Sequence, residues 1–197
     1  MEGWWAASYA VLWILVVVLC LVVVALARQL GTLLLRVESQ GALEIDDEGP
    51  PLEEATRPNE TVDAIGRPVV LGGPGEAQLL LFVSPGCQIC HQVLPAVGAV
   101  ARAGRLVPYV VTDADREETL AAFGKERVGA RIVPGLEIAQ AFAVPGTPYV
   151  VVLDSTGTAV AKGTVNTLEQ MEGLVDTGVR RLDADRTART DGSTLDA

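Results

Sequence analysis

The sequence predicts an α/β domain in which helices cover both faces of a mixed β-sheet, preceded by one N-terminal transmembrane helix. The first observation is an uncharged, strongly apolar run, Gly3 to Ala27. The second is the alternation of strand-length apolar runs with segments of helical spacing between residues 60 and 181. The third is a pair of strand-like runs late in that region, joined by a turn signal. Alternating strands and helices favour parallel pairing and a hairpin pairs antiparallel, so we expect a mixed sheet.

The apolar run is long enough to cross a hydrocarbon core of about 30 Å as a helix. Aromatic residues gather toward its N-terminal end, where amphipathic rings favour the headgroup layer: Trp4, Trp5, Tyr9 and Trp13. We therefore expect residues 1–37 to anchor the chain in the lipid bilayer. A cleaved signal peptide is the alternative, but the chain opens with Glu2 rather than a basic stretch, and the run exceeds an h-region of about 7–15 residues.

Charge does not decide on which side of the membrane the domain lies. Arg28 and Arg36 follow the apolar run and no basic residue precedes it, which by the positive-inside rule keeps the domain in the cytoplasm. The rule weakens when a long domain follows, so the side stays open on this evidence. The net charge of -10 argues against nucleic acid as a partner, because phosphate binding needs clustered Lys and Arg.

Two polar segments flank the predicted domain. Residues 38–59 are acidic, contain two adjacent prolines and show no sustained apolar period, which predicts an extended linker. Residues 182–197 are polar and small, which predicts a disordered tail. The remaining residues, 60–181, have the usual size of one independent domain.

The first half of this domain predicts a hairpin, a strand, a helix and a second strand. Residues 61–71 hold a Gly-Arg-Pro turn between two apolar runs, and 77–84 form a continuous apolar run typical of a strand buried on both faces. Residues 92–104 show helical spacing and end at a glycine. Residues 105–113 follow as the next apolar strand.

The second half predicts two further helices, a hairpin and a closing helix. Residues 115–126 open with acidic side chains, which suit the positive end of a helix dipole, and 134–142 add a short helix. Residues 147–165 form two strands around the turn signal at 155–157. Residues 167–181 have the spacing of an amphipathic helix.

The stretch SPGCQICH places Cys87 and Cys90 where the buried strand gives way to a helix. As CxxC it is a redox-active dithiol, whereas with His91 it matches the attachment site of a c-type haem. Haem needs a second axial ligand, and the methionines are Met1 and Met171. A structural zinc ion needs about four ligands, more than this stretch offers. The strand-to-helix setting favours the dithiol, so we expect no metal and no cofactor besides a redox-active disulfide.

The position of a CxxC at a helix start affects the reactivity of its two cysteines. The first backbone N–H groups and the helix dipole stabilise a thiolate there, which makes Cys87 the expected exposed nucleophile. Cys90, about one turn further on, is placed to attack the mixed disulfide and release the product. His91 is expected in the first turn, as a modulator that favours the Cys87 thiolate when it is protonated.

The order strand, CxxC, helix, followed by the sequence VPGTPY before the last two strands, resembles the thioredoxin superfamily. The resemblance implies that Pro148 follows a cis peptide bond and faces the dithiol. A proline has no N–H, and a cis bond bends the chain. The resemblance also implies that Thr147 binds the backbone of a protein substrate, in the manner of an added β-strand.

A closer resemblance, to the MauD family of methylamine utilisation proteins, covers most of the chain. It rests on VALARQLGTLLLRV, FVSPGCQICHQVLP and PYVVVLDSTGTAVAKGTVNTLEQMEGL. It implies a membrane-anchored thiol–disulfide oxidoreductase or isomerase in the periplasm. Its implied role is maturation of methylamine dehydrogenase, through disulfide formation in the small subunit, with the integral membrane protein MauE as a redox partner.

Two alternatives remain beside this interpretation. One is a thiol reductase of the ResA or TlpA kind, acting on apocytochrome c or another secreted protein. The other, of a different class, is a c-type haem electron carrier.

The sequence around the cysteines differs from that of generic thioredoxins. Those proteins have Trp-Cys-Gly-Pro-Cys, whereas Gly86 precedes Cys87 here and Gln88-Ile89 separates the cysteines. The acid that assists their resolving cysteine has no counterpart in residues 79–84. A thioredoxin-like potential is therefore not expected.

Overall fold

The computed structural model describes Trp4 and residues 8–9, 12–22, 48–126 and 128–192. Residues 12–22 are helical. None of the helices within the described residues is both long and apolar enough to span a membrane. Much of the predicted anchor, 1–37, lies outside the described residues, as does the first part of the predicted linker.

The domain is built on a five-stranded sheet in the order β5-β4-β3-β6-β7. The strands are β3 (Gln78–Val83), β4 (Val107–Thr112), β5 (Arg131–Pro134), β6 (Tyr149–Leu153) and β7 (Ala159–Thr164). β4 pairs parallel with β3 and β5 parallel with β4, whereas β6 and β7 are antiparallel to their neighbours. A separate hairpin joins β1 (Asn59–Val62) to β2 (Pro68–Leu71). The mixed sheet is therefore confirmed.

The central strand β3 divides the core into two layers. All six of its residues are buried, and successive side chains point to opposite faces of a strand. Leu79, Leu81 and Val83 pack into one apolar cluster, and Leu80 and Phe82 into the other. The prediction of a strand buried on both faces is confirmed, and the position of β3 at the centre of the sheet explains the uninterrupted apolar run.

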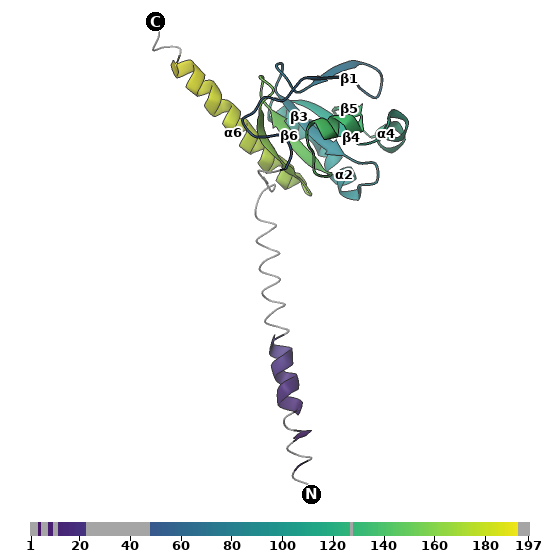
Figure 1. Cartoon of the computed structure of the whole chain (residues 1–197), viewed down its shortest axis with the longest axis vertical. Helices are drawn as coiled ribbons and strands as arrows, with labels where there is room; N and C mark the ends of the chain where they lie inside the picture. Colours follow the sequence, from purple (N-terminus) through teal and green to yellow (C-terminus); the bar gives the residue numbers. More distant parts are fainter. Residues whose placement is uncertain (1–3, 5–7, 10–11, 23–47, 127, 193–197) are drawn as a thin grey trace. The chain divides into compact units, whose positions relative to one another are not determined.

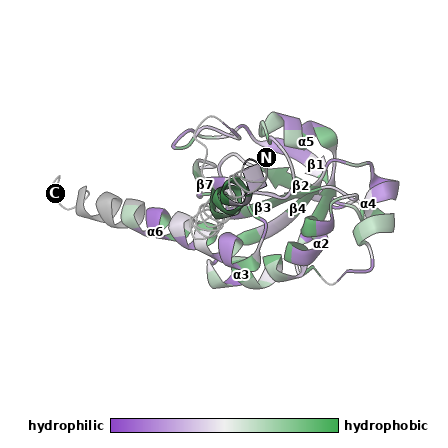
Figure 2. Cartoon of the chain, turned by 90° about the horizontal axis from the view of Figure 1, so that it is seen from below, coloured by the Kyte–Doolittle hydropathy of each residue, from purple (hydrophilic) through white to green (hydrophobic). Residues whose placement is uncertain are grey.

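Helices cover both faces, as Figures 1 and 2 show. The first cluster takes side chains from α2 (Gln88–Val93), α3 (Val97–Ala103) and α6 (Leu168–Gly192). The second takes Ile138 of α5 (Leu136–Ala141) and side chains of the β1–β2 hairpin. The helix α4 (Arg116–Phe123) follows β4 and contributes Phe123 to the first cluster. In Figure 2 the hydrophobic strands β3 and β4 lie between α5 on one side and α2 and α3 on the other.

The helix predicted over residues 92–104 is in fact two helices and begins earlier. α2 starts at Gln88, directly after the first cysteine of the CxxC, and a 3-10 turn (Leu94–Ala96) separates it from α3. Pro95 lies within that turn, near its start. Proline has no N–H to donate to the preceding helical turn, which accounts for the break.

The strand β5 was not predicted. Its four residues, Arg131–Pro134, contain only two central apolar side chains, too few to show a strand period. Its partner is β4, with Val110 opposite Ile132 and Val111 opposite Val133. The strand therefore forms through its pairing with β4 and not through a local sequence pattern.

The prediction of a disordered tail from residue 182 is wrong for residues 182–192, because α6 continues to Gly192. Leu182 is buried in the first cluster, and the guanidinium of Arg181 donates to the Val160 carbonyl at 2.6 Å. These contacts hold the helix on β7 beyond its predicted end. Residues 193–197 lie beyond the described part.

The prediction of a free linker as far as residue 59 is also wrong for its last part. Leu52 forms a parallel bridge with Ala159 of β7, and the amide N–H of Glu53 donates to the Ala159 carbonyl at 3.0 Å. The amide of Thr56 donates to the Gly157 carbonyl at 2.9 Å. β7 is an edge strand, and the unpaired backbone groups of such an edge bind a neighbouring segment. This segment is therefore part of the domain.

Candidate active site

The CxxC lies at the carboxyl end of β3. The short loop after Val83 turns the chain, and the amide N–H of Cys87 donates to the Ser84 carbonyl at 3.0 Å. Cys87 is the N-cap of α2, with an extended backbone (φ -89°, ψ 105°). The central strand thus fixes the position of the first cysteine, as the sequence predicted.

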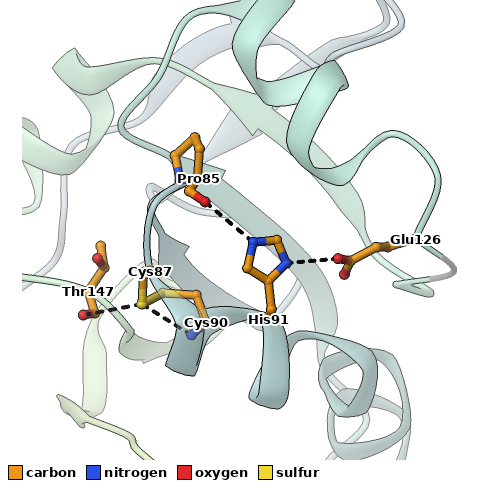
Figure 3. Close-up of a disulfide and its surroundings, with 6 residues drawn as sticks. All are labelled: Pro85, Cys87, Cys90, His91, Glu126 and Thr147. Atoms are coloured by element: carbon orange, nitrogen blue, oxygen red, sulfur yellow. Dashed lines mark hydrogen bonds and ion pairs between the residues drawn. A yellow bond between two sulfur atoms is a disulfide. The ribbon is translucent and has the colours of Figure 1, made fainter.

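Cys87 and Cys90 form a disulfide, with their Cα atoms 5.2 Å apart (Figure 3). Cys87 is partly exposed, whereas Cys90 is fully buried in the first cluster. The amide N–H of Cys90 donates to the Cys87 sulfur at 3.1 Å. In the reduced state the same N–H stabilises a thiolate at Cys87, because an N–H near an anion favours the charged form.

The loop before β6 faces Cys87. The Thr147–Pro148 peptide bond is cis, as the resemblance to thioredoxins implies. The carbonyl oxygen of Thr147 lies 3.8 Å from the Cys87 sulfur. The two segments meet because β6 pairs directly with β3, with Tyr149 opposite Phe82. Pro148 is buried and Thr147 is half-buried, so the accessible side of the disulfide is bordered by Thr147.

His91 lies beside the dithiol and contacts three other segments. Its Nδ1 is 2.9 Å from Glu126 Oε1, its Nε2 is 3.3 Å from the Pro85 carbonyl oxygen, and its ring centre is 5.0 Å from that of Phe123. The hydrogen bond to Glu126 raises the pKa of His91 above its usual 6.5, and this effect outweighs burial, which lowers it. His91 is therefore held in place and biased toward its cationic form.

Glu126 is the residue of this site that sequence reasoning missed. It follows α4 at a separation of 35 residues from His91, in a polar segment without a motif. Only the return of the chain from β4 through α4 brings it to the helix that carries the cysteines. Among the described residues, no three Asp, Glu, Cys or His side chains come together as a metal site.

The family model for the thioredoxin-like domain matches residues 69–178. The methylamine utilization protein MauD of Paracoccus denitrificans is 35% identical over 191 residues, covering 95% of this chain and 92% of that protein. The chain belongs to the MauD family. The MauD protein of Methylorubrum extorquens is 33% identical over 174 residues, covering 86% of this chain and 84% of that protein.

Solved structures share the fold of this MauD family member at low sequence identity. The thioredoxin domain of a thiol-disulfide oxidoreductase from Bacteroides vulgatus gives a TM-score of 0.54 at 20% identity, covering 65% of this chain and 97% of that one. A putative thiol:disulfide interchange protein DsbE from Chlorobium tepidum gives 0.55 at 16% identity, covering 69% and 98%. With its disulfide at a helix start, the protein is a thioredoxin-like thiol–disulfide oxidoreductase.

Proposed function

We propose that this protein is a membrane-anchored, extracytoplasmic oxidoreductase that forms disulfides in the small subunit of methylamine dehydrogenase during its maturation. The observation that carries the proposal is the Cys87–Cys90 disulfide, whose partly exposed sulfur faces the Thr147–Pro148 loop in a chain of the MauD family. The membrane anchor is supported by the uncharged run Gly3 to Ala27. The extracytoplasmic location is supported by the chemistry, since proteins acquire stable disulfides in oxidising compartments.

The difference in exposure between Cys87 and Cys90 supports the roles that we propose for them in the exchange. A substrate thiolate attacks the Cys87 sulfur, a mixed disulfide forms, and Cys90 leaves as a thiolate that takes up a proton. A second substrate thiolate then attacks the substrate sulfur of the mixed disulfide and releases Cys87. The substrate loses two electrons and gains a disulfide, and the Cys87–Cys90 pair gains the two electrons as a dithiol. In the reverse direction Cys87 attacks and Cys90 resolves.

The partly exposed surface at Cys87, bordered by Thr147, is the proposed binding site for the substrate backbone. Thr147 borders the disulfide, and we assign it the backbone contact to an extended substrate segment. Pro148, which we also assign to the substrate-binding site, has no N–H and so does not compete for that contact. The exchange needs no cofactor besides the redox-active disulfide. A membrane redox partner, MauE, accepts the two electrons and restores the disulfide.

The test is the redox state of the small subunit in cells grown on methylamine. In cells that carry Cys87→Ser, the small subunit is expected to accumulate with free thiols, measured as added mass after alkylation of acid-quenched extracts. The matched control is Cys20→Ser, which removes a cysteine outside the site and leaves the subunit oxidised. A fully oxidised small subunit in the Cys87→Ser cells contradicts the proposal. Loss of c-type cytochromes instead supports the reductase alternative, and a Soret band in the purified protein supports the haem alternative.

A further inference from the structure

The two ring nitrogens of His91 both face groups that only accept hydrogen bonds. Nδ1 faces a carboxylate oxygen of Glu126 at 2.9 Å, and Nε2 faces the carbonyl oxygen of Pro85 at 3.3 Å. A neutral imidazole carries one N–H, so it leaves one of these acceptors without a donor, whereas an imidazolium donates to both. The geometry therefore selects the cationic form of His91.

We propose that His91 and Glu126 are a positioning pair that keeps an imidazolium against the CxxC loop, where it stabilises the Cys87 thiolate and makes the disulfide a stronger oxidant. Pro85, the acceptor of the second hydrogen bond, precedes Cys87 by two residues. The imidazolium thus ties the loop before the nucleophile to α2, which carries the resolving Cys90. The inference rests on the proposed exchange at Cys87.

The surroundings of His91 place its ring, rather than the carboxylate of Glu126, next to the cysteines. Figure 3 shows the cysteine pair on one side of the ring and Glu126 on the other. Of the two charged groups, the imidazolium of His91 is therefore nearer the sulfurs than the carboxylate of Glu126. Phe123, which is fully buried, packs against the ring at 5.0 Å between centres and 36° between planes. Glu126 is the charged group whose hydrogen bond and charge raise the pKa of the ring.

The expected effect on redox chemistry follows from the charge. Reduction of the disulfide takes two electrons from the thiols of a partner and leaves Cys87 as a thiolate or thiol. A cation that stabilises the thiolate stabilises the reduced state, so the disulfide accepts electrons more readily. The effect needs an imidazolium and a Cys87 thiolate together. Because the pKa of His91 is raised, the imidazolium persists to higher pH; the effect is lost as the pH rises through that pKa, and also where the pH is low enough to protonate the thiolate.

The first test uses the fact that the chain contains one histidine. NMR titration of its imidazole signals, in the untagged full chain in detergent micelles, needs no assignment of other histidines. We expect the pKa of His91 to lie above 6.5 and to fall in Glu126→Gln. The control is Glu76→Gln, which removes an exposed carboxylate at the opposite end of β3 and leaves the pKa of His91 unchanged. A wild-type pKa at or below 6.5 overturns the proposal.

The second test measures the dithiol itself. His91→Gln keeps a polar side chain of similar size but removes the charge, so we expect the pKa of Cys87 to rise by about one unit, measured by alkylation rate against pH. In equilibration with glutathione at pH 7, the disulfide of His91→Gln should be favoured over the dithiol by about five- to tenfold more than in the wild type. This corresponds to a reduction potential lower by about 20 to 30 mV for a two-electron couple.

The pH profile separates this role from a purely structural one. The wild type and His91→Gln should differ in potential near neutral pH, where an imidazolium faces a thiolate. They should converge at alkaline pH, where His91 is neutral, and at a pH low enough to keep Cys87 as a thiol. An unchanged thiol pKa and potential in His91→Gln overturn the proposal. If that variant does not fold, the titration of His91 in Glu126→Gln still decides. Both measurements use the purified protein and glutathione, so their outcome is independent of whether methylamine dehydrogenase is the substrate.

Discussion

Asp63 shows how a single buried charge joins two parts of the domain. Its carboxylate lies at the β1–β2 turn, accepts the amide N–H groups of Ile65 and Arg67 at 3.1 and 2.8 Å, and pairs with Arg131 of β5 at 3.0 Å. Burial raises the pKa of Asp63, but the hydrogen bonds and the guanidinium outweigh it, so the net shift is downward. The charged form therefore belongs to the folded state and fastens the hairpin to the sheet.

Asp63→Asn is expected to lower the free energy of unfolding by about 2–3 kcal/mol at pH 7, since hydrogen bonds to a charged group are lost at a buried site. A group whose folded pKa is depressed stabilises the fold above its unfolded pKa of about 3.9 and loses that contribution as the pH falls through the folded pKa. Denaturant unfolding at pH 7 and pH 3 should therefore show a smaller acid-induced loss in Asp63→Asn than in the wild type. Asp113→Asn, at an exposed carboxylate, is the control. Equal acid sensitivity of Asp63→Asn and the wild type contradicts this role.

The end of α6 is the helical segment whose formation depends most clearly on tertiary packing. A polar and small-residue composition predicts disorder from residue 182, yet the helix continues to Gly192. Gly178 permits the close approach, because a Cβ there would lie 3.0 Å from a methyl group of Val152. Leu182, one turn later, is 7% exposed and packs into the first cluster. One buried leucine in a polar segment is a weak sequence signal, but it is enough to hold a helix that already packs on the sheet.

Leu182→Ala is expected to lower the free energy of unfolding by about 2–4 kcal/mol, because it removes buried methyl groups and leaves a cavity. The measurement is denaturant-induced unfolding of the purified chain. Glu172→Ala, an exposed position on the same helix, should change the stability by less than about 0.5 kcal/mol. Equal stability of Leu182→Ala and the wild type would show that this turn of α6 does not contribute to the core.

Those parts of the domain that depend on a local sequence pattern were predicted correctly. The continuous apolar run of β3 and the turn signal before β7 carry the mixed sheet, and the strand-to-helix change locates the dithiol. Features that depend on contacts between distant segments could not be predicted. The strand β5 has two apolar residues, too few to show a strand pattern, and Glu126 contacts His91 although the two are 35 residues apart. The edge of β7 likewise recruits Leu52 from a segment whose composition predicts a linker.

The location of the domain is tested with a membrane-impermeant thiol reagent. In a Cys20→Ser background, mild reduction of intact spheroplasts should let the reagent label Cys87, because the site is expected on the outer side of the membrane. The labelled residue is identified by peptide mass mapping. Cys87→Ser in the same background should lose the label. Labelling that appears only after lysis would place the domain in the cytoplasm and contradict a role in disulfide formation outside it.

Covalent trapping by the two single-cysteine variants of the site tests both the attacking sulfur and the identity of the substrate. In Cys90→Ser, the partly exposed Cys87 can form a mixed disulfide that no neighbouring thiol resolves, so a partner should stay attached on non-reducing gels. Cys87→Ser should trap far less, because Cys90 is fully buried. In cells grown on methylamine, mass spectrometry of the trapped complex should identify the small subunit of methylamine dehydrogenase, or MauE from the recycling step. Equal trapping by both variants would contradict the assigned roles of the two cysteines, and apocytochrome c as the trapped partner would contradict the proposed substrate.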